Sequence, residues 1–222
     1  MKVLLNNISK SFNDEKIISN FTVDFPKTGS VCLFGESGSG KTTLFNIISG
    51  ILKADSGEVL GIDGKRISMV FQEDRLLPWL TAKENVQLVL NGANESKAIK
   101  ILSMLGLEDA KDKKPYELSG GMQRRVAIAR ALVFDFDILL LDEPLKGLNK
   151  AIKKRVIETI DSFSSSKLRI IITHDQEEAI CMSDVIYMLI GPPLKIAEKV
   201  EIDRSNLSED KIEEYKKKFI NV

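Results

Sequence analysis

The stretch GESGSGKT at residues 35–42 decides the expected fold of this chain. It fits the pattern G-x-x-x-x-G-K-[ST] completely, and it follows the apolar segment Val31–Phe34. The residues TTLFNIISG continue it as an expected helix that ends at Gly50. Glycines let backbone N–H groups converge on phosphate oxygens, and the helix N-terminus adds its positive end. The sequence therefore predicts that a nucleoside triphosphate binds at this loop.

Two side chains of the loop have expected chemical roles. Lys41 is expected to reach the β- and γ-phosphates and to take part in catalysis, and the Thr42 hydroxyl is expected to hold Mg²⁺. The residues expected to bind ATP here are Gly35, Glu36, Ser37, Gly38, Ser39, Gly40, Lys41, Thr42 and Thr43.

The composition is that of an ordinary soluble globular protein of one domain, with 222 residues, 43% hydrophobic and 29% charged. Lys+Arg and Asp+Glu balance at 32 each, which argues against a protein built to coat nucleic acid. The sequence has no recognisable signal peptide and no apolar run of about 20 residues. Cys32 and Cys181 lie far apart among apolar residues, so we expect two reduced core thiols.

The order of expected elements indicates an α/β fold. Residues from about 74 to 135 look mostly helical, with one stripe formed by Ile99, Leu102 and Leu105. Later strands alternate with helices, one near 176–182, and this predicts a parallel sheet with crossover helices. The tail 207–219 is an expected amphipathic docking helix capped by Ser208. Strands are expected at Phe21–Phe25, Val31–Phe34, Ile67–Phe71, Ile138–Leu141, Arg169–Thr173 and Val185–Ile190.

An acidic pair follows the apolar run Ile138–Leu141. Asp142 is expected to bind Mg²⁺ through water, and Glu143 is expected to polarise the attacking water as a general base. An acidic pair after a strand is more often a cap for the next loop, and the preceding Lys41 favours the catalytic interpretation.

Three further residues have two interpretations each. His174, the only histidine, follows a strand and can contact the γ-phosphate, although a lone histidine is more often a surface or packing residue. Gln72 follows the strand Ile67–Phe71 and can bridge Mg²⁺ and the helical block. Phe12 is either a core residue or a platform that stacks on adenine.

A second glycine motif, LSGGMQ at 118–123, precedes the expected helix QRRVAIARAL. Ser119 and the amides of Gly120 and Gly121 form another anion cradle at a helix N-terminus. Because the first loop already surrounds the phosphates of its own nucleotide, we expect the second cradle to close on ATP held by a partner chain. This predicts a head-to-tail dimer that ATP closes and hydrolysis releases.

The order and spacing of GESGSGKT, Gln72, LSGGMQ, ILLLDEP and His174 resemble the ATP-binding cassette (ABC) ATPases. The resemblance implies a RecA-like P-loop NTPase core with an antiparallel β subdomain and an inserted helical subdomain. On this basis 1–222 is one cassette, with about 1–73 and 136–222 as core plus β subdomain and about 74–135 as the helical subdomain. It also implies an Mg²⁺-dependent ATPase.

A finer resemblance lies in FQEDRLLPWLT at 71–81 followed by ENV, which is similar to importers for nitrate, sulfonate and taurine. It implies that Gln72–Leu80 grips the coupling helix of a transmembrane permease and that a solute-binding protein acts indirectly. It also implies a cytoplasmic position on the inner face of the membrane, with no nucleic-acid partner. The alternative for Trp79 is packing inside the helical lobe.

One residue departs from the pattern of the resemblance. The loop after Glu143 usually ends in S-A-L-D or G-A-L-D, whereas here PLKGLN ends in Asn149. We expect an active ATPase with altered coupling between its two sites.

The importer function has two alternatives. The chain is either a soluble ABC ATPase without a transport role, or an ATP-binding module with weak turnover.

Overall fold

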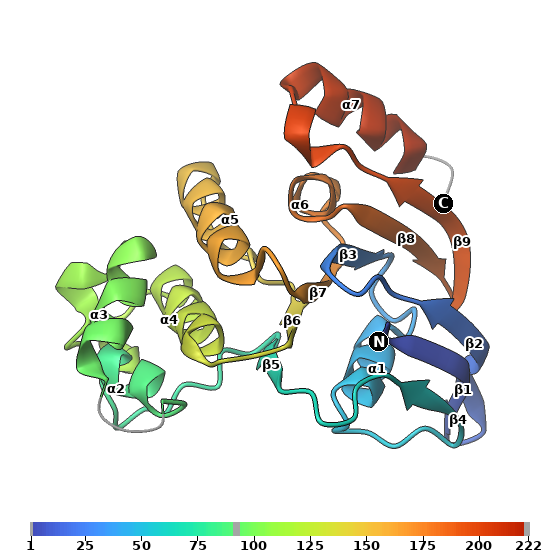
Figure 1. The fold of residues 1–222 in the computed structure, drawn as a ribbon, viewed down its shortest axis with the longest axis horizontal. Helices are drawn as coiled ribbons and strands as arrows, with labels where there is room; N and C mark the ends of the chain where they lie inside the picture. Colours follow the sequence, from blue (N-terminus) through green and yellow to red (C-terminus); the bar gives the residue numbers. More distant parts are fainter. Residues whose placement is uncertain (1, 91–93, 220–222) are drawn as a thin grey trace. The chain divides into compact units, whose positions relative to one another are not determined.

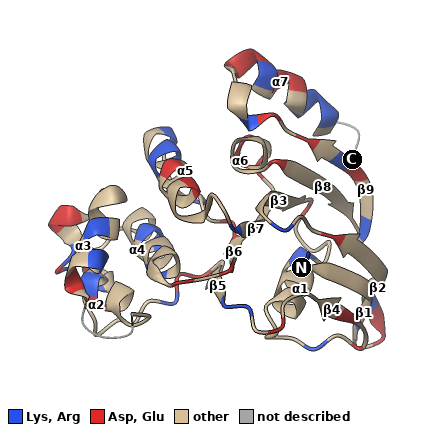
Figure 2. Cartoon of the chain, viewed as in Figure 1, with Lys and Arg blue, Asp and Glu red and all other residues tan. Residues whose placement is uncertain are grey.

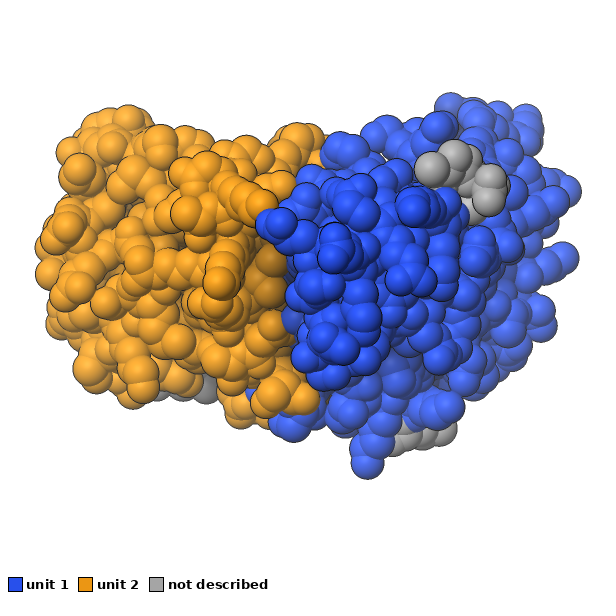
Figure 3. All heavy atoms as spheres, turned by 90° about the horizontal axis from the view of Figure 1, so that it is seen from above, with its two compact units in different colours: residues 1–65, 166–222 blue, residues 66–165 orange. Residues whose placement is uncertain are grey.

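The computed structural model describes residues 2–90 and 94–219 (Figure 1). The chain forms two compact units, unit 1 with residues 1–65 and 166–222, and unit 2 with residues 66–165 (Figure 3). These bounds differ from the expected helical subdomain at about 74–135, because unit 2 also contains strands and a further helix. The expected division of the cassette into subdomains stays a prediction.

Unit 1 contains an antiparallel sheet of three strands in the order β2-β1-β4. The strands are β1 (Leu4–Phe12), β2 (Glu15–Asp24) and β4 (Ser56–Leu60). The predicted alternation is confirmed in β2, where Phe21 and Val23 are buried and the residues between and after them are exposed. β4 was not expected from the sequence, because its side chains are exposed or half-buried and show no apolar alternation.

The second sheet of unit 1 has the order β7-β3-β8-β9. β3 lies between two parallel neighbours, and β9 pairs antiparallel with β8. The predicted parallel strands are confirmed, but β9 was not expected, because all but one of its side chains are exposed. The strands are β3 (Gly29–Phe34), β7 (Leu168–Thr173), β8 (Val185–Ile190) and β9 (Lys195–Glu201).

Three helices accompany these strands, α1 (Lys41–Ile48), α6 (Gln176–Met182) and α7 (Glu209–Lys218), with a 3₁₀ turn η3 (Arg204–Asn206). The predicted tail helix is confirmed: Ser208 Oγ accepts from Lys211 N at 3.3 Å. Acidic residues lie in its first turn and lysines in its last, as the helix dipole favours (Figure 2). Ile212 and Tyr215 of α7 pack against a core cluster that includes Ile180 of α6, so the tail docks on its own unit.

Unit 2 combines a parallel strand pair, β5 (Ile67–Val70) and β6 (Ile138–Asp142), with helices. Val156 and Ile160 are buried. Leu102 and Leu105 of the predicted stripe are also buried, whereas Ile99 is only half-buried. The helices are α2 (Ala82–Gln87), α3 (Glu95–Met104), α4 (Gly120–Val133) and α5 (Lys150–Ser164), and the 3₁₀ turns are η1 (Glu108–Ala110) and η2 (Pro115–Glu117).

Cys32 is buried in the core of unit 1, while Cys181 is only half-buried, so the expectation of a core thiol is correct for the first residue and wrong for the second. Both are free thiols, as predicted. Over residues 2–90 and 94–219, every helix is too short or too polar to cross a membrane.

Candidate nucleotide-binding site

The glycine loop of unit 1 joins the end of β3 to the start of α1. A Cβ at Gly35 would lie 2.3 Å from the carbonyl oxygen of Leu189, so only glycine fits at this close approach of two backbone segments. Gly40 is the N-cap of α1 with φ at +103°, a conformation that side chains rarely adopt. The loop therefore ends at the N-terminus of a helix, where backbone amides and the helix dipole favour a phosphate.

Lys41 lies within this loop, with only 7% of its surface exposed. Its Nζ donates to the carbonyl oxygen of Glu36 at 2.5 Å and to Ser39 Oγ at 3.2 Å. Ser39 N also donates to Glu36 O at 3.3 Å, which closes the loop on itself. Thr42 is exposed and Thr43 is half-buried, so the Thr42 hydroxyl is accessible at the first turn of the helix.

His174 follows the last residue of β7, and strand register relates it to the glycine loop. Phe34 of β3 pairs with Thr173 of β7, so Gly35 and His174 leave adjacent parallel strands at the same level. The turn after His174 is fixed, because Asp175 N donates to Thr173 Oγ1 at 3.1 Å and Asp175 Oδ1 accepts from Glu178 N at 3.0 Å. His174 is exposed at this carboxyl edge, where parallel sheets bind ligands.

Phe12 ends β1 with 46% of its surface exposed, so the interpretation as a core residue is wrong. Lys10 Nζ lies 5.4 Å from the centre of its ring. The remaining ring surface is available for stacking.

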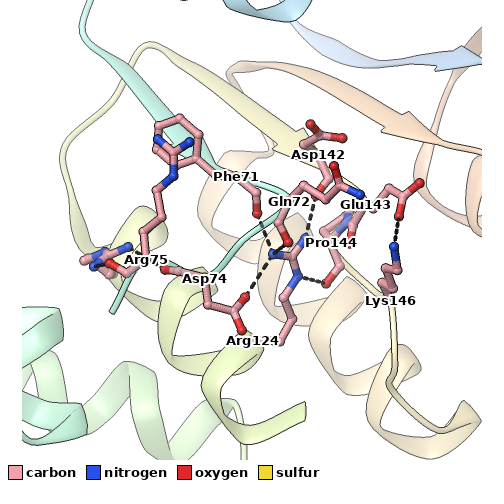
Figure 4. Close-up of polar contacts among 10 residues, drawn as sticks. Phe71, Gln72, Asp74, Arg75, Arg124, Asp142, Glu143, Pro144 and Lys146 are labelled. Carbon is pink, nitrogen blue, oxygen red and sulfur yellow. Dashed lines mark hydrogen bonds and ion pairs between the residues drawn. The ribbon is translucent and has the colours of Figure 1, made fainter. Parts of the chain in front are cut away.

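In unit 2, β6 ends at Asp142, which is 4% exposed, and Glu143 follows it with φ at +45°. Few non-glycine residues adopt such a φ, and those that do are often found at functional sites. The Glu143 side chain is 13% exposed, and its Oε2 lies 3.1 Å from Lys146 Nζ (Figure 4). The acidic pair is thus held in a constrained turn directly after a buried strand.

The side chain of Arg124, from α4, occupies the space between the β5 end and the β6 end (Figure 4). Its guanidinium donates to five backbone carbonyls of the two segments, Phe71 O, Gln72 O, Asp142 O, Glu143 O and Pro144 O, and also to the side-chain oxygen Asp74 Oδ1. The sequence interpretation missed Arg124. Arg124 lies four and seven residues before Ile128 and Ala131, which are both buried, so it shares the inner face of α4 with them. This spacing is visible in the sequence and could have identified Arg124 as a buried arginine.

Gln72 is exposed, while its carbonyl accepts from Arg124 Nη1 at 3.3 Å. Further along, buried Asn85 of α2 donates from Nδ2 to the carbonyls of Leu77 and Leu80 at 3.2 Å each. Trp79 between them is 65% exposed, so the alternative in which it packs inside the helical lobe is wrong.

The second glycine motif lies at the N-terminus of the 14-residue helix α4. Ser119 is the N-cap, and its Oγ accepts from Met122 N at 3.3 Å. Ser119 and Gly120 are exposed, and Gly121 is half-buried. Gln123 braces the turn by donating to Pro115 O at 2.9 Å and Leu118 O at 3.1 Å. The motif therefore lies at a second exposed helix N-terminus, a position that favours an anion.

Asn149 is the N-cap of α5, and its Oδ1 accepts from Ile152 N at 3.0 Å. The residue thus has a structural role that aspartate would perform equally well.

The oxygen donors expected for Mg²⁺ are the Thr42 hydroxyl, the Gln72 amide and the Asp142 carboxylate. These donor types suit Mg²⁺, which takes one or two carboxylates together with substrate phosphates and water. Across the part of the chain that the structure describes, no cluster of three His, Cys, Asp or Glu side chains could hold a metal alone.

Comparison with known proteins places the chain in a family. The ABC transporter family model matches residues 18–146, more than half of the chain. The aliphatic sulfonates import ATP-binding protein SsuB 1 of Shouchella clausii is 34% identical over 85% of this chain and 77% of its own length. The taurine import ATP-binding protein TauB of Rhizobium johnstonii is 34% identical over 84% of this chain and 76% of its own length.

A solved structure has the same fold: the ATP-binding cassette MJ0796, dimeric and bound to ADP and Pi in a post-hydrolysis state. It is 30% identical, with a TM-score of 0.79 over 90% of this chain and 99% of the other. The chain belongs to the ABC transporter family and is an ABC-type ATPase that binds and hydrolyses ATP. The predicted RecA-like fold and the resemblance to the sulfonate and taurine group are confirmed.

Proposed function

We propose that this chain is the ATP-hydrolysing subunit of an ABC importer, which couples closure of an ATP-bound dimer to solute movement through a membrane permease. The observation that carries the proposal is the pairing of a complete phosphate loop with a second exposed glycine motif at the N-terminus of α4. The import proteins among its relatives support the transport role.

Within this proposal the predicted site residues divide into those that bind ATP and those that act on it. The amides of Gly35–Thr43 and the Lys41 ammonium bind the triphosphate, and Phe12 stacks on the adenine. Glu143 takes a proton from the attacking water, and His174 contacts the γ-phosphate. The burial of Lys41 in its loop and the constrained turn at Glu143 support these assignments.

The proposed metal is Mg²⁺ held by Thr42, Gln72 and Asp142. When bound, it would neutralise charge on the phosphate oxygens and orient them for in-line attack. The near-complete burial of the Asp142 side chain suits a carboxylate with one fixed task.

The proposed assembly is a head-to-tail dimer in which Ser119, Gly120 and Gly121 of one subunit close on ATP of the other. The exposed cap of α4 is accessible for this contact. The dimeric, ADP- and Pi-bound form of the similar cassette supports it.

The proposed permease contact is Gln72–Leu80, with Trp79 presented outward, on the inner face of the cell membrane. A tryptophan exposed to 65% is a typical anchor for a protein interface. A solute-binding protein would act with the permease, and the solute that we propose resembles nitrate, a sulfonate or taurine.

The test is copurification of a permease with the tagged chain, followed by ATPase assays after joint reconstitution in lipid. We expect the permease to stimulate ATP hydrolysis. In Trp79→Ala we expect this stimulation to be at least five-fold smaller, while the hydrolysis rate without the permease is retained. Ile51→Ala, a change at another apolar residue exposed to 60%, is the matched control. Hydrolysis that no permease stimulates would favour a non-transport ABC ATPase, and no hydrolysis even with a permease would favour a weakly active binding module.

A further inference from the structure

Arg124 joins two segments that have different tasks in the proposed function, on which this inference rests. One segment begins at Phe71 and leads into Gln72–Leu80, the proposed permease contact. The other is Asp142–Pro144, which carries the proposed metal ligand and general base. Both belong to unit 2, and both receive hydrogen bonds from the one guanidinium (Figure 4).

We call the Arg124 guanidinium and the acceptors that it binds in the two segments the Arg124 clamp. Each nitrogen of the guanidinium has its own acceptors. Nη1 donates to Phe71 O at 2.5 Å and pairs with Asp74 Oδ1 at 3.0 Å. Nη2 donates to Asp142 O at 2.5 Å and Glu143 O at 2.6 Å, and Nε donates to Pro144 O at 3.2 Å. The two ends of the fork therefore face different segments. A planar guanidinium can do this, whereas the single ammonium of lysine cannot.

The clamp is also buried, since the Arg124 side chain is 5% exposed and Asp74 is 22% exposed. Hydrogen bonds from a charged donor are strongest where water is excluded, and a carbonyl left without a donor there is costly. A displacement of the Phe71–Asp74 segment must therefore either carry the Asp142–Pro144 segment with it or break buried hydrogen bonds.

A neighbouring arginine on the same helix provides a matched comparison. Arg130 donates to Asp74 O and Arg75 O, both at 2.9 Å, and so anchors the first segment alone. No hydrogen bond from Arg130 to Asp142–Pro144 is found among the described residues. The two arginines differ in whether they reach the catalytic segment.

We propose that Arg124 is a positioning residue that links the permease-facing segment to the catalytic carboxylate, so that movement of the Gln72–Leu80 segment changes the placement of Glu143. Arg124 acts through the backbone of these segments. It also lies five residues after Ser119 on α4, so the same helix carries the second glycine motif.

The experiment compares Arg124→Lys with Arg130→Lys in the reconstituted ATPase–permease complex. Arg124→Lys is expected to lower the permease-stimulated kcat at least ten-fold while the KM for ATP changes less than two-fold. Arg130→Lys is expected to keep stimulation within three-fold of wild type. A fall in kcat with little change in the KM for ATP indicates that the hydrolytic group is misplaced. Loss of ATP binding would instead raise the KM, and loss of folded protein would lower the amount of ATP bound.

Trp79, the only tryptophan, gives a second readout in the isolated chain. Wild type and Arg130→Lys are expected to change Trp79 fluorescence when ATP replaces ADP, and Arg124→Lys is expected to lose at least 80% of that change. If Arg124→Lys does not fold, Asp74→Asn tests the same clamp, with an expected two- to four-fold loss of stimulation.

Two results would overturn the inference: stimulation and fluorescence response retained within two-fold in Arg124→Lys, or an equal loss in Arg130→Lys. For Asp74→Asn, stimulation unchanged from wild type would overturn it. A wild-type complex without stimulation would count against the proposed function, and the fluorescence comparison would still decide the role of Arg124.

Discussion

Lys146 Nζ lies 3.1 Å from Glu143 Oε2, so the proposed general base is ion-paired within its own turn (Figure 4). The backbone supports the pairing, since Lys146 N donates to Glu143 O at 3.3 Å. Because the Lys146 side chain is 59% exposed, water and salt weaken this pair. In the proposed mechanism, the ammonium would compete with the attacking water for the carboxylate.

Lys146→Met is therefore expected to raise kcat by about 1.5- to 5-fold, the range that corresponds to about 0.2–1 kcal/mol for an exposed ion pair. Lys146→Arg keeps the pair and should stay near the wild-type rate. Steady-state ATPase assays at fixed ionic strength check this. A lower kcat in Lys146→Met would mean that the lysine assists hydrolysis.

Gly35→Ala is expected to weaken ATP binding at least ten-fold, because the new Cβ would lie 2.3 Å from Leu189 O and the loop must move. Overpacking of this kind costs about 1–3 kcal/mol of stability. Gly50→Ala is the control, because its Cβ meets nothing within 4 Å and only its φ of +75° is unfavourable. Titration with a fluorescent ATP analogue measures ATP affinity, and urea unfolding measures stability. Equal ATP affinities in the two variants would refute the prediction.

Asn149→Asp is expected to change cooperativity in ATP without lowering stability. The aspartate can accept the same hydrogen bond from Ile152 N, and its charge favours the N-terminus of α5. Asn149→Ala, which removes the cap, should lose about 1 kcal/mol in urea unfolding. If Asn149→Asp leaves the rate, the Hill coefficient and dimerisation unchanged, the proposed effect on coupling between sites is wrong.

Because of Cys32, we expect the free energy of unfolding to fall at alkaline pH. Burial raises the pKa of its thiol from 9.0 to about 12. The unfolded thiol therefore ionises above pH 9 while the folded thiol stays protonated, and the stabilisation present below pH 9 is lost as pH rises toward 12. Relative to Cys32→Ala, the wild type should lose about 1.4 kcal/mol of unfolding free energy per pH unit in this window.

Urea unfolding of wild type and Cys32→Ala between pH 8 and 10.5 measures this difference, since other titrating groups are common to both. Cys181→Ala serves as the control, because the half-buried Cys181 should contribute a smaller slope. Parallel pH profiles for wild type and Cys32→Ala would contradict the assignment.

Strong local patterns made most of the fold predictable. The apolar run at β6, the glycine loop before α1 and the cap at Ser208 specify their structures within a few residues. β4 and β9 were missed because edge strands with exposed side chains lack an apolar period. Arg124 was missed for a different reason: the carbonyls that it binds come from segments 18 and 53 residues away in sequence.

Dimer formation by Glu143→Gln tests whether ATP closes a dimer that hydrolysis releases, because this change removes the proposed base and retains the shape of the side chain. In sedimentation experiments with ATP and Mg²⁺, we expect a stable dimer with bound, unhydrolysed ATP, and a monomer with ADP. A Glu143→Gln protein that binds ATP and stays monomeric, or that hydrolyses ATP at the wild-type rate, would contradict it.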